Sequence, residues 1–176
     1  VGFLQVFSAL LLSEADEFSP LNGRDLIKEK VEKVWVMAGK WDEEGGKEHN
    51  FCNNARSRKA AHIFTEKCPV PVTFLGFEVG IKVISGNSLS ENDHLYKAFK
   101  DHGSEKGRYS WDPLTALLAV IGDEEKAGYK TVTGTASVDP ETGRNYFKED
   151  KNGPHKYVIP LFGASYYEEK INERIN

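Results

Sequence analysis

The sequence predicts an α/β fold: a Rossmann-like, mostly parallel open sheet with flanking helices and a small C-terminal β-hairpin. Two short apolar runs, residues 34–38 and 72–75, are each followed by a glycine, as is typical of buried parallel strands. A helical pattern over residues 55–67 lies between them. A helix that connects two strands of one sheet makes those strands parallel. Residues 131–138 alternate and run through a turn into residues 145–147, which predicts the hairpin.

The other elements follow from apolar spacing along the chain. Apolar side chains at helical spacing predict helices, in chain order, over residues 4–12, 22–32, 91–102, 113–121 and 166–175. Residues 157–159 predict one further strand, and residues 39–54 predict a long loop after the first strand. In open α/β sheets ligands bind beyond the carboxyl ends of the strands, so we expect binding groups in this loop and just after residue 75.

The start of the chain predicts that residues 1–176 form only part of a domain. A chain of this length can bury one domain core. The first residues, from Val1 to Gln5, contain no initiator Met and no basic segment, so they do not resemble a signal peptide. They look instead like the end of a strand that runs into a helix. We therefore expect the C-terminal half of a single domain whose N-terminal part would precede Val1.

Composition and charge argue against two classes of partner. The formal net charge is −4, with acids and bases interspersed, so we expect no basic surface for a nucleic acid. No apolar run reaches the roughly 18–20 residues that span a bilayer, so we expect no membrane partner. Cys52 and Cys68 form no Cys-x-x-Cys pair and predict free thiols, which favours a cytoplasmic location.

The loop after the first strand contains the polar run Glu48-His49-Asn50. If this stretch is extended, the carboxylate of Glu48 and the carboxamide of Asn50 point to the same side. Together they can accept from and donate to the vicinal hydroxyls of a sugar. A solvated loop would carry the same residues, and that alternative stays open.

Two further carboxylates are candidates for a site. Glu78 lies just beyond the second strand, where it either contacts a ligand or holds a loop. Asp112 follows Trp111 and precedes Pro113 at the start of an apolar helix. Asp112 is either the N-cap of that helix, with Pro113 at the first helical position, or a hard oxygen ligand for a divalent cation such as Ca²⁺.

The order of these segments resembles the inosine-uridine preferring nucleoside hydrolase family. Members have a strand ending in Met-Gly-Gly, then Glu-Phe-Asn before a helix, then a strand ending in an acidic residue, then a helix that begins with Asp-Pro. The segments that match are, in order, Met37-Ala38-Gly39, Glu48-His49-Asn50, Phe77-Glu78 and Asp112-Pro113. The likeness runs from Val1 to about Phe147 and so covers most of the chain.

The resemblance implies a Ca²⁺-dependent hydrolase that cleaves the N-glycosidic bond of a ribonucleoside into free base and ribose. Asp112 matches the family's C-terminal aspartate ligand, and Val1 matches the residue whose backbone carbonyl binds the metal. Glu48 and Asn50 match the pair that binds ribose, and Glu78 is a further expected substrate contact. The expected partner is a small-molecule nucleoside, as in purine and pyrimidine salvage. A homo-oligomer of the full-length protein stays open.

Three departures from the family pattern bear on this expectation. The family's N-terminal aspartates, which supply the other metal ligands and the general base, would precede Val1, so we expect the chain alone to be inactive. Trp111 stands where many members have the histidine that protonates the leaving base; it can stack on that base instead. His49 replaces the family's Phe and is the candidate group for assisting the leaving base. The alternative function is a non-catalytic, nucleoside hydrolase-like protein that binds ribonucleosides.

Overall fold

The computed structural model describes residues 2–175, which divide into two compact units. Unit 1 runs up to Phe77 and resumes over Thr131–Val158. Unit 2 takes Glu78–Lys130 and the chain from Ile159 onward. Each unit is thus assembled from segments that are distant in the sequence. The expectation of a single domain stays a prediction.

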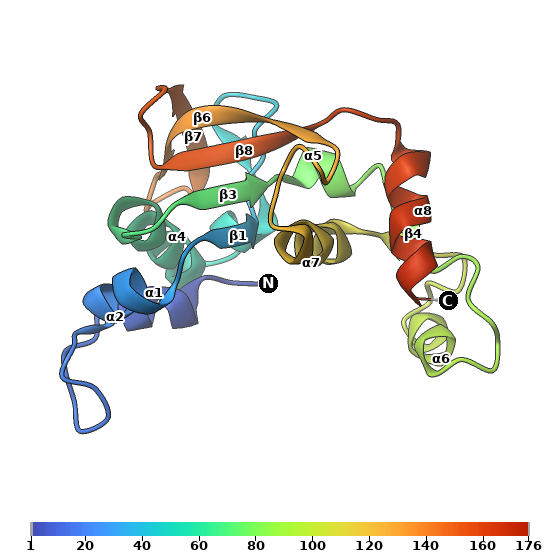
Figure 1. Cartoon of the computed structure of the whole chain (residues 1–176), viewed down its shortest axis with the longest axis horizontal. Coiled ribbons are helices and arrows are strands. Elements are labelled where there is room, and N and C mark those ends of the chain that lie inside the picture. The colour runs from blue at the N-terminus through green and yellow to red at the C-terminus, as the bar shows by residue number, and fades with distance from the viewer. Residues whose placement is uncertain (1, 176) are drawn as a thin grey trace. The chain divides into compact units, whose positions relative to one another are not determined.

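Unit 1 is built on a six-stranded mixed sheet (Figure 1). The strand order is β1–β3–β8–β6–β7–β2, with bounds Val34–Met37, Val72–Leu75, His155–Pro160, Tyr129–Val138, Arg144–Glu149 and Gly46–Lys47. β1 pairs with β3 and β3 with β8 in parallel, whereas β7 pairs antiparallel with β6 and β2. This parallel core confirms the predicted α/β fold class, and the predicted hairpin, β6–β7, extends the same sheet.

The helices of unit 1 are α1, α2, α3 and α4, with bounds Gln5–Leu11, Gly23–Lys30, His49–Cys52 and Ala55–Lys67. α4 begins after Asn54, whose side chain caps it by accepting from the N–H groups of Arg56 and Ser57. The helix connects β1 to β3, as predicted. α1 packs on α4, where Ser8 Oγ donates to the carbonyl of Ala60 over 2.7 Å. Both helices lie beside β1 and β3 in Figure 1.

The core of unit 1 lies between α4 and the parallel strands. Phe64 from α4 and Phe74 from β3 are fully buried, and their rings meet edge to face with centroids 6.4 Å apart. The ring of Trp41 lies 4.9 Å from that of Phe74. Every residue of β3 is buried, which explains why its sequence is a continuous apolar run rather than an alternating one.

Unit 2 contains a small antiparallel pair and three longer helices. The strands β4 (Ile84–Ser85) and β5 (Arg108–Tyr109) pair with each other. The helices are α6, α7 and α8, with bounds His94–Asp101, Trp111–Ile121 and Ala164–Ile175. The one-turn helix α5, Phe77–Gly80, starts in unit 1 and ends in unit 2. α8 holds β4 through Glu168, whose carboxylate accepts from the N–H of Ile84 over 3.0 Å.

Three local predictions were wrong. The predicted loop of residues 39–54 contains β2 and α3, so Glu48 and Asn50 do not lie in one extended stretch. The helix α7 starts at Trp111 with Ser110 as its N-cap residue, so Asp112 is not the N-cap and Pro113 is not the first helical residue. The helix predicted from residue 91 begins at His94, because the Asp93 carboxylate caps it by accepting from the N–H of Leu95.

Among residues 2–175, no helix combines the length and the apolarity needed to cross a membrane. Cys52 and Cys68 are both free thiols, as predicted.

Candidate functional site

The predicted sugar-binding pair, Glu48 and Asn50, lies at the carboxyl end of β1. Glu48 precedes α3 and caps it: one carboxylate oxygen accepts from the N–H of Asn50 over 2.9 Å. Its other oxygen accepts from the N–H of Gly39 over 3.0 Å. The Asn50 side chain donates to the carbonyl of Met37 over 3.0 Å. Glu48 and Asn50 therefore lie together at the strand end, through a helix cap rather than through an extended segment.

Gly39 allows this turn because its backbone has φ +82° and a side chain there would collide with the ring of Trp41. Its carbonyl accepts from the N–H of Phe77 over 2.8 Å, which ties the end of β1 to the residue that opens α5. The residues just beyond β1 are therefore held by hydrogen bonds from Gly39 to the Glu48 carboxylate and from Phe77 to Gly39.

Burial sets the electrostatics of Glu48. Only 4% of this residue is exposed, and desolvation raises the pKa of its carboxyl group. The backbone N–H groups of Asn50, Gly39 and Phe51 and the nearby His49 act in the opposite direction. A carboxylate has about four acceptor positions, so two hydrogen bonds leave capacity for a sugar hydroxyl. In the structure the Glu48 carboxylate is buried and holds the strand end, rather than lying in a solvated loop. Its contact with ribose stays a prediction.

His49 is exposed at the start of α3. Its ring lies 5.5 Å from the ring of Phe3, tilted by 40°. The imidazole therefore sits beside the same strand end as Glu48 and Asn50, on the solvent side, where it can contact a ligand. Its assistance to a leaving base stays a prediction.

Asp112 lies in the first turn of α7, in unit 2. Its side chain reaches solvent, yet the protein around it raises the pKa of the carboxyl group by desolvation. No hydrogen bond or ion pair joins this carboxylate to another residue in the described range 2–175. A partly desolvated carboxylate is suited to bind a cation.

Trp111 packs tightly within unit 2. The ring lies 5.3 Å from that of Tyr109, and a Cβ added at Gly80 would come within 2.2 Å of Trp111 Cδ1. Glycine at the end of α5 therefore makes room for the indole. Glu78, the other candidate of this unit, lies in the first turn of α5, directly after the strand end as predicted.

Calcium is implied by the family resemblance, and the described residues supply one suitable ligand for it. Asp112 has the chemistry of a hard oxygen ligand. Val1, the expected carbonyl ligand, lies outside the described residues. Among residues 2–175 no group of three or more His, Cys, Asp or Glu side chains could hold a metal ion. Asp112 thus fits as one member of a ligand set and does not make a site alone.

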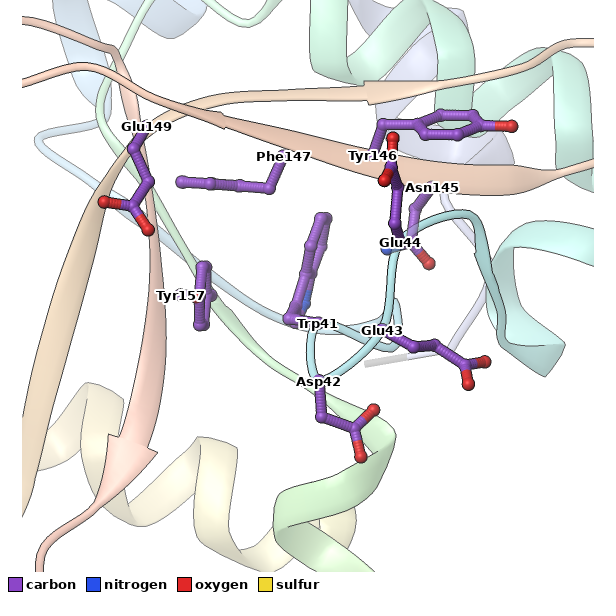
Figure 2. Close-up of a pocket in the computed structure, with 9 residues that line it drawn as sticks. All are labelled: Trp41, Asp42, Glu43, Glu44, Asn145, Tyr146, Phe147, Glu149 and Tyr157. Carbon is purple, nitrogen blue, oxygen red and sulfur yellow. The ribbon is translucent and has the colours of Figure 1, made fainter.

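Two features of unit 1 were not predicted. His155 in β8 is 1% exposed, and its Nδ1 accepts from the N–H of Ala136 over 2.9 Å. The second is a cavity of about 300 Å³ lined by nine residues: Trp41, Asp42, Glu43, Glu44, Asn145, Tyr146, Phe147, Glu149 and Tyr157 (Figure 2). Residues 145–147 were predicted to begin the return strand of the hairpin, but nothing in the sequence pointed to a cavity there. Their partners in the loop after β1 lie about a hundred residues away in the chain.

Comparison with known proteins shows which solved structure has a similar fold. The structure is similar to the crystal structure of an inosine-uridine preferring nucleoside hydrolase from Bacillus anthracis, with a TM-score of 0.54 and 18% sequence identity. The match covers 97% of this chain and 57% of that one, so the chain spans little more than half the length of this neighbour. No protein-family model and no curated protein sequence matches the chain. The chain therefore has a nucleoside hydrolase-like fold.

Proposed function

We propose that the complete protein to which this chain belongs hydrolyses the N-glycosidic bond of ribonucleosides, releasing a free base and ribose. The observation that carries the proposal is the placement of Glu48 and Asn50 at the carboxyl end of β1 in a nucleoside hydrolase-like fold. Ligands of parallel α/β sheets bind at this end of the strands. Because the chain spans 57% of its structural neighbour, the activity is proposed for the complete protein.

Each residue has a proposed role that its surroundings support. The Asn50 amide nitrogen is occupied by Met37, and no described residue donates to its amide oxygen, which is available to a ribose hydroxyl. The negative charge of Glu48 would stabilise the positive charge that develops on the sugar as the bond breaks. Asp112 would be one ligand of a Ca²⁺ ion, whose charge favours ionisation of a nearby water when the ion is bound.

Two residues of this chain, Trp111 and His49, are proposed to contact the leaving base. Trp111 would stack on it, and His49 would donate a proton or a hydrogen bond to it. Glu78 would be a further substrate contact. Since indole does not titrate, Trp111 itself cannot protonate the base.

The second candidate is a protein that binds ribonucleosides without turning them over. Trp111 favours it, because stacking strengthens binding whereas the family's histidine at this position assists departure of the base. Calorimetry on the complete protein separates the two: tight binding of inosine or uridine that persists without release of reducing sugar favours the binding protein.

The role of Asp112 has a direct test. The complete protein and its Asp112→Asn variant are assayed for reducing sugar from inosine and uridine, and their bound calcium is measured. We expect Asp112→Asn to lose calcium and at least about a hundredfold in activity, since a metal contributes several kcal/mol to such a reaction. Asp101→Asn, an exposed aspartate at the end of α6, is the matched control. Unchanged activity and calcium content in Asp112→Asn would remove Asp112 from the metal site.

A further inference from the structure

Two buried serines join β4 to the start of α7. Ser85 belongs to β4 and Ser110 is the N-cap residue of α7, and their exposed fractions are 2% and 0%. Their hydroxyl oxygens lie 2.7 Å apart, the usual length of an O–H···O hydrogen bond. The Ser110 hydroxyl also donates to the carbonyl of Arg108 over 3.3 Å, so Ser85 supplies the proton between the two serines. We call Ser85 and Ser110 the serine pair.

The side chain of Ser110 does not cap the helix that it precedes. A serine at this position usually accepts a hydrogen bond from the N–H of the second or third helical residue. The third residue of α7 is Pro113, which has no N–H, and the Ser110 hydroxyl makes no capping bond to α7. The hydroxyl is instead directed to Ser85. Ser110 therefore attaches the start of α7 to a strand rather than stabilising the helix end itself.

The backbone of Ser110 is held at the same place as its side chain. The N–H of Ser110 lies 2.9 Å from the carbonyl of Val83 and 3.3 Å from that of Gly80. The segment that ends in β4 thus binds both the main chain and the hydroxyl of Ser110. The first turn of α7, which contains Asp112, therefore has little freedom to move relative to β4.

The helix α8 holds β4 in turn. The carboxylate of Glu168 accepts from the N–H of Ile84, and the amide oxygen of Asn172 accepts from the N–H of Gly86, each over 3.0 Å. Ser85 lies between these two N–H groups in the chain, and α8 and β4 lie side by side (Figure 1). A series of hydrogen bonds within unit 2 therefore runs from α8 through β4 and the serine pair to the start of α7.

We propose that Ser85 is a positioning residue for Asp112, a role that rests on the proposed function of Asp112 as a calcium ligand. Ser85 holds Ser110, which lies two residues before Asp112. Within residues 2–175 no hydrogen bond orients the Asp112 carboxylate, so the helix that carries it sets its place. Metal–ligand distances vary by only about 0.2 Å, so a small shift of one ligand weakens the site. The Ser85 hydroxyl thus acts on calcium through Asp112, without contacting the ion.

The serine pair is tested by calcium titrations of the complete protein and three variants, followed by calorimetry. The variants are Ser85→Ala, Ser110→Ala and the double variant. We expect each single substitution to lower calcium affinity about tenfold, as substitutions behind metal ligands commonly do. The double variant should lose about as much as either single variant, because all three lack the same hydrogen bond. Losses that simply add would show that the two hydroxyls act separately and would contradict the proposal.

A matched control separates the position of Asp112 from the stability of unit 2. Tyr167→Phe also removes a buried hydroxyl, which donates to the carbonyl of Gly128 and takes no part in the bonds that lead to α7. We expect it to lower stability in urea denaturation about as much as Ser85→Ala does, yet to bind calcium as the parent does. An equal loss of calcium affinity in Tyr167→Phe and Ser85→Ala would overturn the positioning role, since any weakening of unit 2 would then suffice.

The same titrations distinguish this inference from the proposed function. A parent protein that binds calcium and a Ser85→Ala variant that binds it equally well would overturn the positioning role and leave the role of Asp112 standing. A parent protein that binds no calcium would overturn the role of Asp112 as a ligand, and the positioning role with it. Weaker binding in Ser85→Ala, with parent affinity kept in Tyr167→Phe, is the result that the proposal predicts.

Discussion

At the scale of single residues, Glu48 links local folding to the candidate site. Its two carboxylate oxygens accept from two backbone N–H groups, one at the end of β1 and one in α3. Both bonds need an acceptor, and only a carboxylate offers two equivalent ones at this geometry. The same charge that would face a sugar cation therefore also joins the strand to the helix that follows.

Glu48→Gln tests this double role. One oxygen is replaced by an NH₂ donor that faces a backbone N–H, so a buried donor loses its partner. We expect the free energy of unfolding to fall by about 1–3 kcal/mol in urea denaturation. Lys47→Gln, at an exposed neighbouring position, should change it by less than about 0.5 kcal/mol. Unaltered stability in Glu48→Gln would show that the two bonds do not hold the strand end together.

His155 makes stability depend on pH. Burial lowers its pKa from 6.5 to about 4, so between these values the unfolded chain binds a proton that the folded chain does not. Above about pH 6.5 this group therefore leaves the free energy of unfolding unreduced. As the pH is lowered toward 4, the free energy of unfolding falls by on the order of 3 kcal/mol at most.

The check is urea denaturation from pH 4 to 7. His155→Asn keeps an acceptor for the N–H of Ala136 but cannot titrate, so we expect it to flatten part of the pH dependence. His94→Asn, at an exposed position, should leave the dependence as in the parent. A His155→Asn variant with the parent's full slope would contradict a buried neutral imidazole.

Some of these residues could be predicted from the sequence and others could not. Glu48 and Asn50 were predicted to act together, because side chains two residues apart in an extended stretch point to the same side. The stretch is not extended, since Asn50 lies in α3. The bond that joins Glu48 to the strand end could not be predicted, since it depends on the N–H of Gly39 being turned toward the carboxylate. Trp41 gave no signal, because one aromatic residue in an acidic loop is ordinary and its partners in β7 and β8 come from far along the chain.

At the scale of elements, the local sequence pattern predicted the bounds of a helix or strand correctly where tertiary packing favours the same structure. α4 and β3 have the predicted bounds, because Asn54 provides a cap and the apolar run of β3 is buried on both faces. α3 was missed because it is a single turn that starts from the Glu48 cap, too short to show helical spacing. α7 begins earlier than predicted, so Asp112 lies inside its first turn.

The end of α5 offers a test of packing around Trp111. Gly80→Ala would place a methyl group 2.2 Å from the Trp111 ring and 2.7 Å from its Cα, so the start of α7 must shift. We expect a loss of about 1–3 kcal/mol in unfolding free energy, with a change in tryptophan fluorescence. Gly163→Ala, where nothing lies within 4 Å, is the control and should have little effect. Equal stability of the two variants would contradict the tight packing of Trp111 on α5.

At the scale of the whole molecule, the parallel core could be predicted because a helix between two strands of one sheet leaves few alternatives. The division into two compact units could not be predicted. Segments of the two units alternate along the sequence. β6 begins and β8 ends in unit 2, so no linker or change of composition marks the boundary. Periodicity reports local structure, whereas this division depends on long-range contacts.

The central claim is that this nucleoside hydrolase-like fold serves to cleave ribonucleosides. The most direct measurement is chromatography of the products that the complete protein forms from inosine and from uridine, in the presence of calcium. The account predicts equal amounts of free base and ribose, formed at a rate proportional to protein concentration and abolished by a calcium chelator. No free base from either inosine or uridine, whether or not the nucleoside is bound, would contradict it.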